Sequence, residues 1–215
     1  MKQSQIFLNS EGNAWYKRNF KIISKNILKK DILLIQLEKI IKEFPNKKIN
    51  ILEIGCSNGR ILNYLKIKFP KVQAYGLEPS KLAIKNKLSK KIFIKQGVGN
   101  NIPFKNKRFD ILIFGFCLYL CDTADLINIV REASRVTKSL SYIAIDDFFS
   151  KKIAYNKYHH KKGIFTRKMD YSQIFLWHPF YSLLFKKIFR YESNIKKNKN
   201  LSNSRSVFIL KKSEF

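Results

Sequence analysis

The chain has 215 residues, 45% of them hydrophobic, and its 43 lysines and arginines against 15 acidic residues give a formal net charge of +28. This length and hydrophobic content are enough to bury the core of one α/β domain. Residues 1–5 do not lead into the apolar core of a secretory signal, and the longest apolar run, residues 111–121, is too short to span a bilayer. We therefore expect a cytoplasmic protein without an integral membrane segment.

The positive charge has two interpretations. Lysines near phosphates release counterions and give affinity for nucleic acid without sequence specificity. Arginine, which suits bidentate phosphate and base contacts, is scarce, and the lysines are spread along the chain, as the codon bias of an AT-rich genome alone would produce. We favour a solvated basic surface, and an acidic or phosphorylated substrate is compatible with both interpretations.

The segment before the first predicted strand combines a polar, aromatic decapeptide with a long helical pattern. The decapeptide, residues 10–19, is too polar and too aromatic for a simple helix lead-in. The helical pattern that follows extends to about residue 44, and its apolar residues are spaced for one core-facing side. We expect residues 1–48 to form a helical cap.

An apolar run over residues 49–54, followed by a glycine-containing loop, is the most informative feature. The run is rich in β-branched residues and contains the acid Glu53, and the loop carries Gly55 and Gly59 before a helical pattern begins. The run predicts a buried parallel strand, and the glycines let the following turn bring its backbone against a ligand.

A second strand is predicted over residues 72–77, and it ends at Glu78. An acid at this strand tip suits a ribose diol, because its two oxygens accept from both hydroxyls. The nicotinamide fingerprint requires glycines at positions that are Gly55, Ser57 and Arg60 here, so only the first fits. The two strand ends together indicate a nucleoside-bearing cofactor at the carboxyl edge of a parallel sheet.

The pattern acid-x-Gly-x-x-x-Gly resembles the first motif of class I S-adenosylmethionine-dependent methyltransferases, and Glu78 lies where their ribose-binding acid lies. Residues 96–104 and 108–113 look like the segment that joins the third and fourth strands of this family. The resemblance implies an α/β fold, with a Rossmann-like, seven-stranded, mostly parallel sheet and helices on both faces. Strands are expected near residues 50–54, 72–77, 91–96, 110–115 and 141–146, with a helix over residues 123–137 capped by Asp122 or Thr123.

The resemblance also implies S-adenosyl-L-methionine as the cofactor. Glu53 and the glycine loop would surround its methionine end, Glu78 would hold the ribose, and residues 100–102 would cover the adenine. The expected cofactor contacts are Glu53, Gly55, Cys56, Ser57, Gly59, Glu78, Pro79, Gly99, Asn100, Asn101, Ile102 and Gly115.

One departure from the family pattern concerns adenine. The position after Gly97 is often an acid that accepts from the adenine amino group, and here it is Val98. Adenine recognition must then rest on backbone groups near Gly99 and Asn100 and on apolar packing, or on an asparagine side chain.

The decapeptide also resembles the N-terminal segment of a bacterial subgroup of these methyltransferases that is associated with surface-polysaccharide or sugar modification. The resemblance implies that Trp15 and Tyr16 pack at the pocket mouth and that Arg18 or Asn19 reaches polar groups of the ligand. The alternative is an aromatic contact that docks a helix on the sheet. Tyr119, at the end of the fourth predicted strand, and Tyr158 are further candidate substrate or lid contacts.

The fifth predicted strand ends in Asp146 and Asp147, which strand alternation sends to opposite sides of the sheet. An acid at the carboxyl edge can orient or deprotonate a substrate hydroxyl. The subgroup resemblance selects Asp147 for this role, and the alternative is a carboxylate that anchors a loop.

Residues 151–190 are dense in aromatic residues, and Tyr158, His159 and His160 resemble the subgroup most closely. Paired histidines suggest a metal, but no third ligand lies at a familiar spacing, and Cys56, Cys117 and Cys121 have no such spacing either. We therefore predict no metal site. A general base or a sugar contact is expected of His159 or His160, with a small-domain core as the alternative.

The last part of the chain is expected to close the sheet. Residues 174–189 also fit an amphipathic helix on anionic lipid, although Pro179 interrupts it and core packing explains the pattern as well. Residues 191–195 and 205–211 are predicted as two closing strands around a lysine-rich turn.

These features predict one domain over residues 1–215, with a helical cap (1–48), a cofactor-binding core (49–149), a substrate-side insertion (150–190) and closing strands (191–215). The expected function is methyl transfer to a small-molecule acceptor, a hydroxyl of a sugar or nucleotide-linked surface-glycan intermediate. Asp147, His159 and His160 are the candidate bases. One alternative is an RNA methyltransferase that uses the basic surface, and another is a non-catalytic domain that binds the cofactor or a protein partner. The sequence leaves the oligomeric state and the acceptor atom open.

Overall fold

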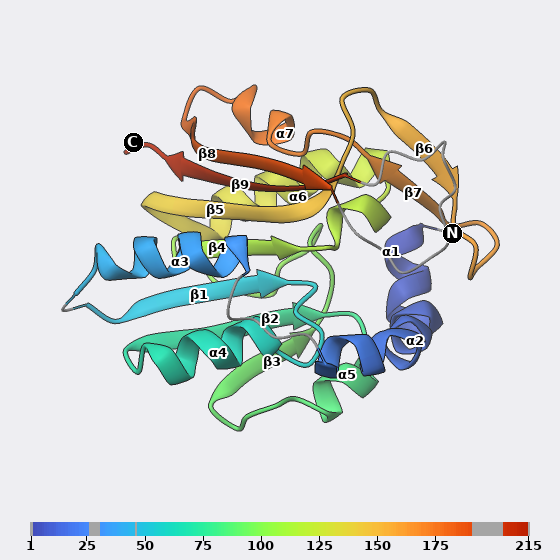
Figure 1. Cartoon of the computed structure of the whole chain (residues 1–215), viewed down its shortest axis with the longest axis horizontal. Helices are drawn as coiled ribbons and strands as arrows, with labels where there is room; N and C mark the ends of the chain where they lie inside the picture. The colour runs from blue at the N-terminus through green and yellow to red at the C-terminus, as the bar shows by residue number, and fades with distance from the viewer. Residues whose placement is uncertain (1, 26–30, 46, 191–203, 215) are drawn as a thin grey trace.

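The computed structural model describes residues 2–25, 31–45, 47–190 and 204–214, and a seven-stranded sheet forms its centre (Figure 1). The strand order is β3-β2-β1-β4-β5-β9-β8. The first five strands in this order are parallel, whereas β9 is antiparallel to β5 and β8 is antiparallel to β9. The predicted fold class, a Rossmann-like α/β sheet of the class I methyltransferase type, is confirmed.

The five parallel strands lie close to their predicted positions. They are β1 (Ile49–Ile54), β2 (Val72–Glu78), β3 (Ile92–Gln96), β4 (Phe109–Gly115) and β5 (Thr137–Phe149). The largest deviation is in β5, which begins directly after the preceding helix and pairs with β4 through a register shift between Phe109 and Ile111.

The closing strands are β8 (Tyr181–Arg190) and β9 (Ser204–Lys212). The predicted strand over residues 191–195 lies outside the described residues, and the strand that pairs with β9 precedes it. The amphipathic helix considered for residues 174–189 is wrong, because β9 pairs with most of this segment and only α7 (Gln173–Leu176) is helical.

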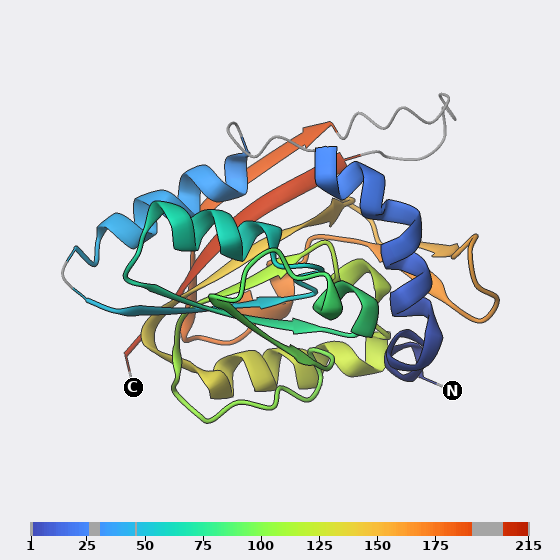
Figure 2. The ribbon, with the colours of Figure 1, turned by 90° about the horizontal axis from the view of Figure 1, so that it is seen from below.

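Helices cover both faces of the sheet (Figure 2). One face is covered by α3 (Ile32–Lys42) and α4 (Arg60–Lys68), whose Leu37 and Leu62 pack with Ile51 of β1. The other face is covered by α6 (Thr123–Val136), whose Ile129 packs with Ile54. Strand alternation in β1 therefore supplies both cores. Asp122 is the N-cap residue of α6, as predicted.

The N-terminal segment lies across the carboxyl ends of the parallel strands (Figure 1). It comprises α1 (Gln3–Ile6), the π-helical turn η1 (Phe7–Glu11) and α2 (Gly12–Lys25). The decapeptide over residues 10–19, which was predicted to be distinct from the helical pattern, is therefore itself helical. A separate hairpin, β6 (Ala154–Lys157) and β7 (Phe165–Lys168), lies beside this segment. Among the described residues, no helix is long and apolar enough to cross a bilayer.

Candidate functional site

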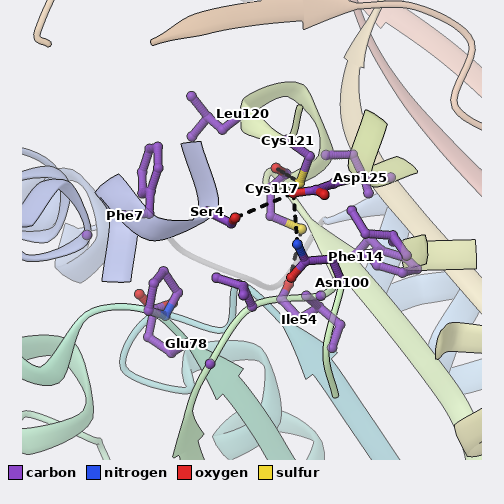
Figure 3. A pocket seen from close by; sticks show the side chains of 18 of the residues that line it. Ser4, Phe7, Ile54, Glu78, Asn100, Phe114, Cys117, Leu120, Cys121 and Asp125 are labelled. Carbon is purple, nitrogen blue, oxygen red and sulfur yellow. Dashed lines mark hydrogen bonds between the residues drawn. The ribbon is translucent and has the colours of Figure 1, made fainter. Parts of the chain in front are cut away.

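A cavity of about 110 Å³ opens at the carboxyl ends of the central strands (Figure 3). Its floor comes from β1, β2 and β4 and from the loop over residues 97–100. Its cover comes from the N-terminal segment, which contributes Ser4, Phe7, Gly12 and Trp15. This is the edge at which open parallel sheets bind their ligands.

The glycine loop folds back beneath the cavity. Gly55, Ser57 and Gly59 all have positive φ, at 72°, 52° and 79°. A Cβ added at Gly55 would lie 2.7 Å from Cβ of Cys117, so a larger residue cannot occupy this position without displacing its neighbour. The loop backbone thereby reaches the cavity wall at Gly55.

The carboxylate of Glu78 joins the loop to the second strand. Its Oε2 accepts from the Ser57 N–H at 2.8 Å and its Oε1 accepts from the Ser80 N–H at 2.9 Å. The side chain lines the cavity, and burial raises its pKa to about 7 despite these two hydrogen bonds. This position and these acceptors fit a ribose diol.

Glu53 lies behind the cavity wall, where its carboxylate is buried. Burial raises its pKa well above the usual value, although Arg60 opposes this, and its Oε2 has no hydrogen-bond partner among the described residues. The hydroxyl of Ser57 is also buried without a partner there. Buried acceptors of this kind normally have donors, so they fit the ammonium group of an amino-acid ligand.

The predicted cofactor contacts are only partly brought together. Those that line the cavity are Gly55, Glu78, Pro79, Gly99, Asn100 and Gly115. Those that do not are Glu53, Cys56, Ser57, Gly59, Asn101 and Ile102. Ile102 belongs to the core, and its N–H donates to Glu132 at 2.8 Å.

The predicted lid residues divide in the same way. Trp15 lines the cavity, whereas Tyr16 is buried on another side of α2 and Asn19 donates to the Trp15 carbonyl within the helix. Arg18 pairs with the buried Glu11 and donates to the Tyr158 hydroxyl at 2.9 Å. The contact with Tyr158 fastens α2 to the β6–β7 hairpin, and the pair with Glu11 lies within the N-terminal segment, so Arg18 does not reach into the cavity.

Tyr119 follows β4 and packs against the same small apolar cluster as Trp15 and Tyr158. It is half-buried, packs with Trp15 and lies edge-on to Phe148 at 4.9 Å between ring centroids. Burial raises the pKa of its hydroxyl. Tyr119 therefore lies beside the cavity, where its ring packs with other aromatic side chains.

The candidate bases do not meet at the cavity. Asp147 is fully buried, and it accepts from the backbone N–H groups of Leu118, Tyr119 and Phe148. This geometry is that of a carboxylate that anchors the loop after β4. Burial raises its pKa to about 7. His159 and His160 are exposed in the turn of the β6–β7 hairpin. No cluster of metal ligands occurs in the described part of the chain.

Several cavity residues were missed by sequence reasoning. They are Ser4, Phe7, Cys117, Cys121, Asp122 and Asp125. Asp122 was predicted only as a helix cap. It is the N-cap residue of α6, but its side chain does not cap the helix, and its Oδ2 accepts from the Gln3 N–H at 2.7 Å. A usable signal was the position of Asp122 and Asp125 just beyond the carboxyl end of the fourth strand, but nothing in the sequence indicated the docking of residues 3–12.

Comparison with known proteins gives a partial sequence match. Residues 52–145 match the model of a methyltransferase domain family. Uncharacterized proteins of Mycobacterium tuberculosis and Mycobacterium bovis are 31% identical over 85 residues, which cover 40% of this chain and 27% of those proteins. The chain thus spans about a quarter of the length of the curated relatives that it matches.

Solved structures match over nearly the whole chain. A 1,6-didemethyltoxoflavin-N1-methyltransferase from Burkholderia thailandensis, solved with 1,6-didemethyltoxoflavin and S-adenosylhomocysteine, has a TM-score of 0.70 at 10% identity and covers 98% of this chain and 89% of its own. A putative methyltransferase of Haloferax volcanii, in complex with the Trm112 methyltransferase activator, has a TM-score of 0.70 at 12% identity. The match covers 97% of this chain and 98% of that one. The chain therefore has the class I methyltransferase fold, with a methyltransferase-domain match over residues 52–145.

Proposed function

We propose that this chain is a cytoplasmic S-adenosyl-L-methionine-dependent methyltransferase acting on a small-molecule acceptor. One observation carries the proposal: the buried carboxylate of Glu78 lines the cavity at the tip of β2, and its Oε2 accepts from the Ser57 N–H of the glycine loop. A strand-tip acid joined to a tight glycine turn suits a nucleoside with a free ribose diol. The methyltransferase-domain match over residues 52–145 supports the same conclusion.

The chain's residues have separate roles toward the cofactor, which supplies an activated sulfonium methyl group when bound. Glu78 accepts from the ribose hydroxyls, and the backbone at Gly55 lets the amino-acid end approach the sheet. Glu53 lies behind the cavity wall, and its orphaned Oε2 is our candidate acceptor for the ammonium group. Trp15 lines the cavity and Tyr119 packs near it, so these two rings are our candidates for positioning the acceptor. Such positioning supplies much of the acceleration in a displacement reaction.

The acceptor is proposed to be a sugar or nucleotide-linked intermediate, methylated on a hydroxyl. The N-terminal segment covers the cavity, which favours a small molecule over a polymer. The neighbouring hairpin supports an acceptor that carries phosphate. Residues 148–169 contain no acidic residue, and their exposed cations are Lys151, Lys152, Lys157, Lys161 and Lys162. None of these five lysines takes part in an ion pair with another described residue.

Proton removal from a hydroxyl acceptor was assigned to Asp147, His159 or His160. The backbone hydrogen bonds of Asp147 and the exposed turn that holds the histidines do not support this assignment. The proposal therefore rests on positioning rather than on a named base.

The proposal is tested by transfer of a labelled methyl group from S-adenosyl-L-methionine to nucleotide sugars and to bulk RNA, at about 50 and 300 mM salt. Label in the nucleotide-sugar fraction, with little salt dependence, is the expected result. Label in RNA that falls steeply with salt would favour the RNA alternative instead, because counterion release governs that binding. Cofactor binding with no transfer to either pool would favour a non-catalytic domain.

A further inference from the structure

The loop after β3 lacks the adenine-binding acid expected from the family resemblance, since Val98 occupies that position and lines the cavity. A carboxylate from another element lies on the same wall (Figure 3). Asp125, in the first turn of α6, lines the cavity although only 2% of its surface is exposed. Its Oδ2 accepts from Nδ2 of Asn100 at 2.8 Å and from the Ser4 hydroxyl at 3.4 Å.

The carboxylate of Asp125 retains capacity for a ligand. Its Oδ1 accepts from Nζ of Lys2 at 3.2 Å, and the Lys2 side chain is 64% exposed, so this ion pair is a weak one. An ionised carboxylate has about four acceptor positions, and three are used here. The amide of Asn100 donates through Nδ2, which leaves its oxygen as a second acceptor beside the first.

As an acid in the first turn, Asp125 suits the amino end of α6, but this role does not require the side chain to be buried. The N-cap residue of α6 is Asp122, and the apolar residues of the helix pack on the sheet without the Asp125 side chain. Burying a carboxylate is costly unless donors surround it. Two of its three donors, Ser4 and Lys2, come from the N-terminal segment that covers the cavity.

We propose that Asp125, oriented by Asn100, accepts a hydrogen bond from the exocyclic amino group of the adenine and makes the cavity selective for adenine over hypoxanthine. This inference rests on the proposed cofactor. Hypoxanthine presents an oxygen where adenine presents an amino group, so an acceptor would face an acceptor. One well-placed polar contact discriminates between bases by about tenfold to a hundredfold.

Asp122 is a matched control. It lies one turn earlier, lines the same cavity and also fixes the N-terminal segment, through the Gln3 N–H at 2.7 Å. It has no hydrogen bond to Asn100 among the described contacts. Loosening of the N-terminal segment should therefore affect both variants, whereas loss of base selectivity should affect only Asp125.

The experiment is calorimetric titration of wild type, Asp125→Asn and Asp122→Asn with S-adenosylhomocysteine and with its deaminated analogue, S-inosylhomocysteine. Wild type should prefer the adenine ligand by about tenfold or more. Asp125→Asn should bring this ratio close to one, because a carboxamide both donates and accepts. Asp122→Asn should keep the wild-type ratio even if both affinities fall.

The possible failures are distinguishable. If wild type bound neither ligand, the proposed cofactor itself would be wrong. Equal binding of both ligands by wild type, or a wild-type ratio in Asp125→Asn, would overturn only the role of Asp125. If Asp125→Asn does not fold by circular dichroism, Asn100→Leu takes its place, and the inference then requires a ratio lower than that of wild type, since the carboxylate loses the amide that orients it.

Discussion

The two halves of the cavity are built in different ways. The floor comes from strand ends near one another in sequence, and Glu78 bonds to Ser57 across 21 residues. The cover comes from segments far apart. Gln3 donates to the Leu120 carbonyl at 2.7 Å across 117 residues, and Arg18 reaches Tyr158 across 140. A ligand site can thus combine a part encoded in a local motif with a part that only tertiary packing creates.

The largest expected effect is on the floor, at Gly55. Gly55→Ala should abolish detectable S-adenosylhomocysteine binding, a loss of about 100-fold or more, because the new Cβ would lie 2.7 Å from Cβ of Cys117 at a φ of +72°. Calorimetry measures this loss. Gly163→Ala is the control, since its φ is +83° with no atom within 4 Å of the new Cβ, so it should cost about 1 kcal/mol of stability without changing affinity. Equal affinity losses in both would show that general destabilisation, rather than the contact with Cys117, is responsible.

The next effect distinguishes an anchor from a base at Asp147. Asp147→Asn should lower the free energy of unfolding by about 1–3 kcal/mol, because the amide nitrogen cannot accept from a backbone N–H as the carboxylate does at both oxygens. Urea unfolding at neutral pH measures it. Unchanged stability with lost methyl transfer would instead identify Asp147 as a base.

A smaller effect concerns the fastening of the cover. Arg18→Ala should destabilise the protein by about 1–2 kcal/mol, since among the described side chains it leaves the buried Glu11 with only the Tyr158 hydroxyl, at 3.3 Å. Partial exposure of Arg18 limits the loss. Limited proteolysis should then cut the chain near α2 more readily. Asn19→Ala, which removes a bond within the helix only, should behave like wild type. Identical proteolysis of the two variants would contradict the fastening role.

The smallest effect is the pH dependence of the floor. Burial raises the pKa of Glu78 to about 7, so the carboxyl is mostly protonated at pH 6 and mostly ionised at pH 8. Since the ionised form accepts from both ribose hydroxyls, S-adenosylhomocysteine should bind up to about tenfold more tightly at pH 8 than at pH 6. Glu78→Gln should bind weakly with no such dependence. The same pH slope in both proteins would exclude Glu78 as its source.

Sequence reasoning succeeded where function depends on local order. The strand β1, its glycine loop and the acid after β2 were predicted because hydrophobic runs and glycines act within a few residues. It failed at Asp147. Strand alternation predicts which face of the sheet a side chain takes, but not that the N–H groups of Leu118 and Tyr119 will donate to the carboxylate there.

The cover was less predictable for a related reason. Ser4 enters the cavity wall, and bonds to Asp125, only through the docking of the N-terminal segment, which no periodicity encodes. Residues 10–19 were identified as unusual, yet of the four side chains predicted there to contact the ligand, only Trp15 lies against the cavity.

The ribose contact of Glu78 is tested most directly by calorimetric titration of S-adenosylhomocysteine into wild type and into Glu78→Ala. Wild type should bind with micromolar affinity and the variant should lose binding, because the carboxylate that receives the ribose is gone and the Ser57 N–H loses its acceptor. Wild-type affinity in Glu78→Ala would contradict the assigned ribose contact. No binding to wild type would contradict the proposed cofactor, and the glycine loop would then be a structural turn only.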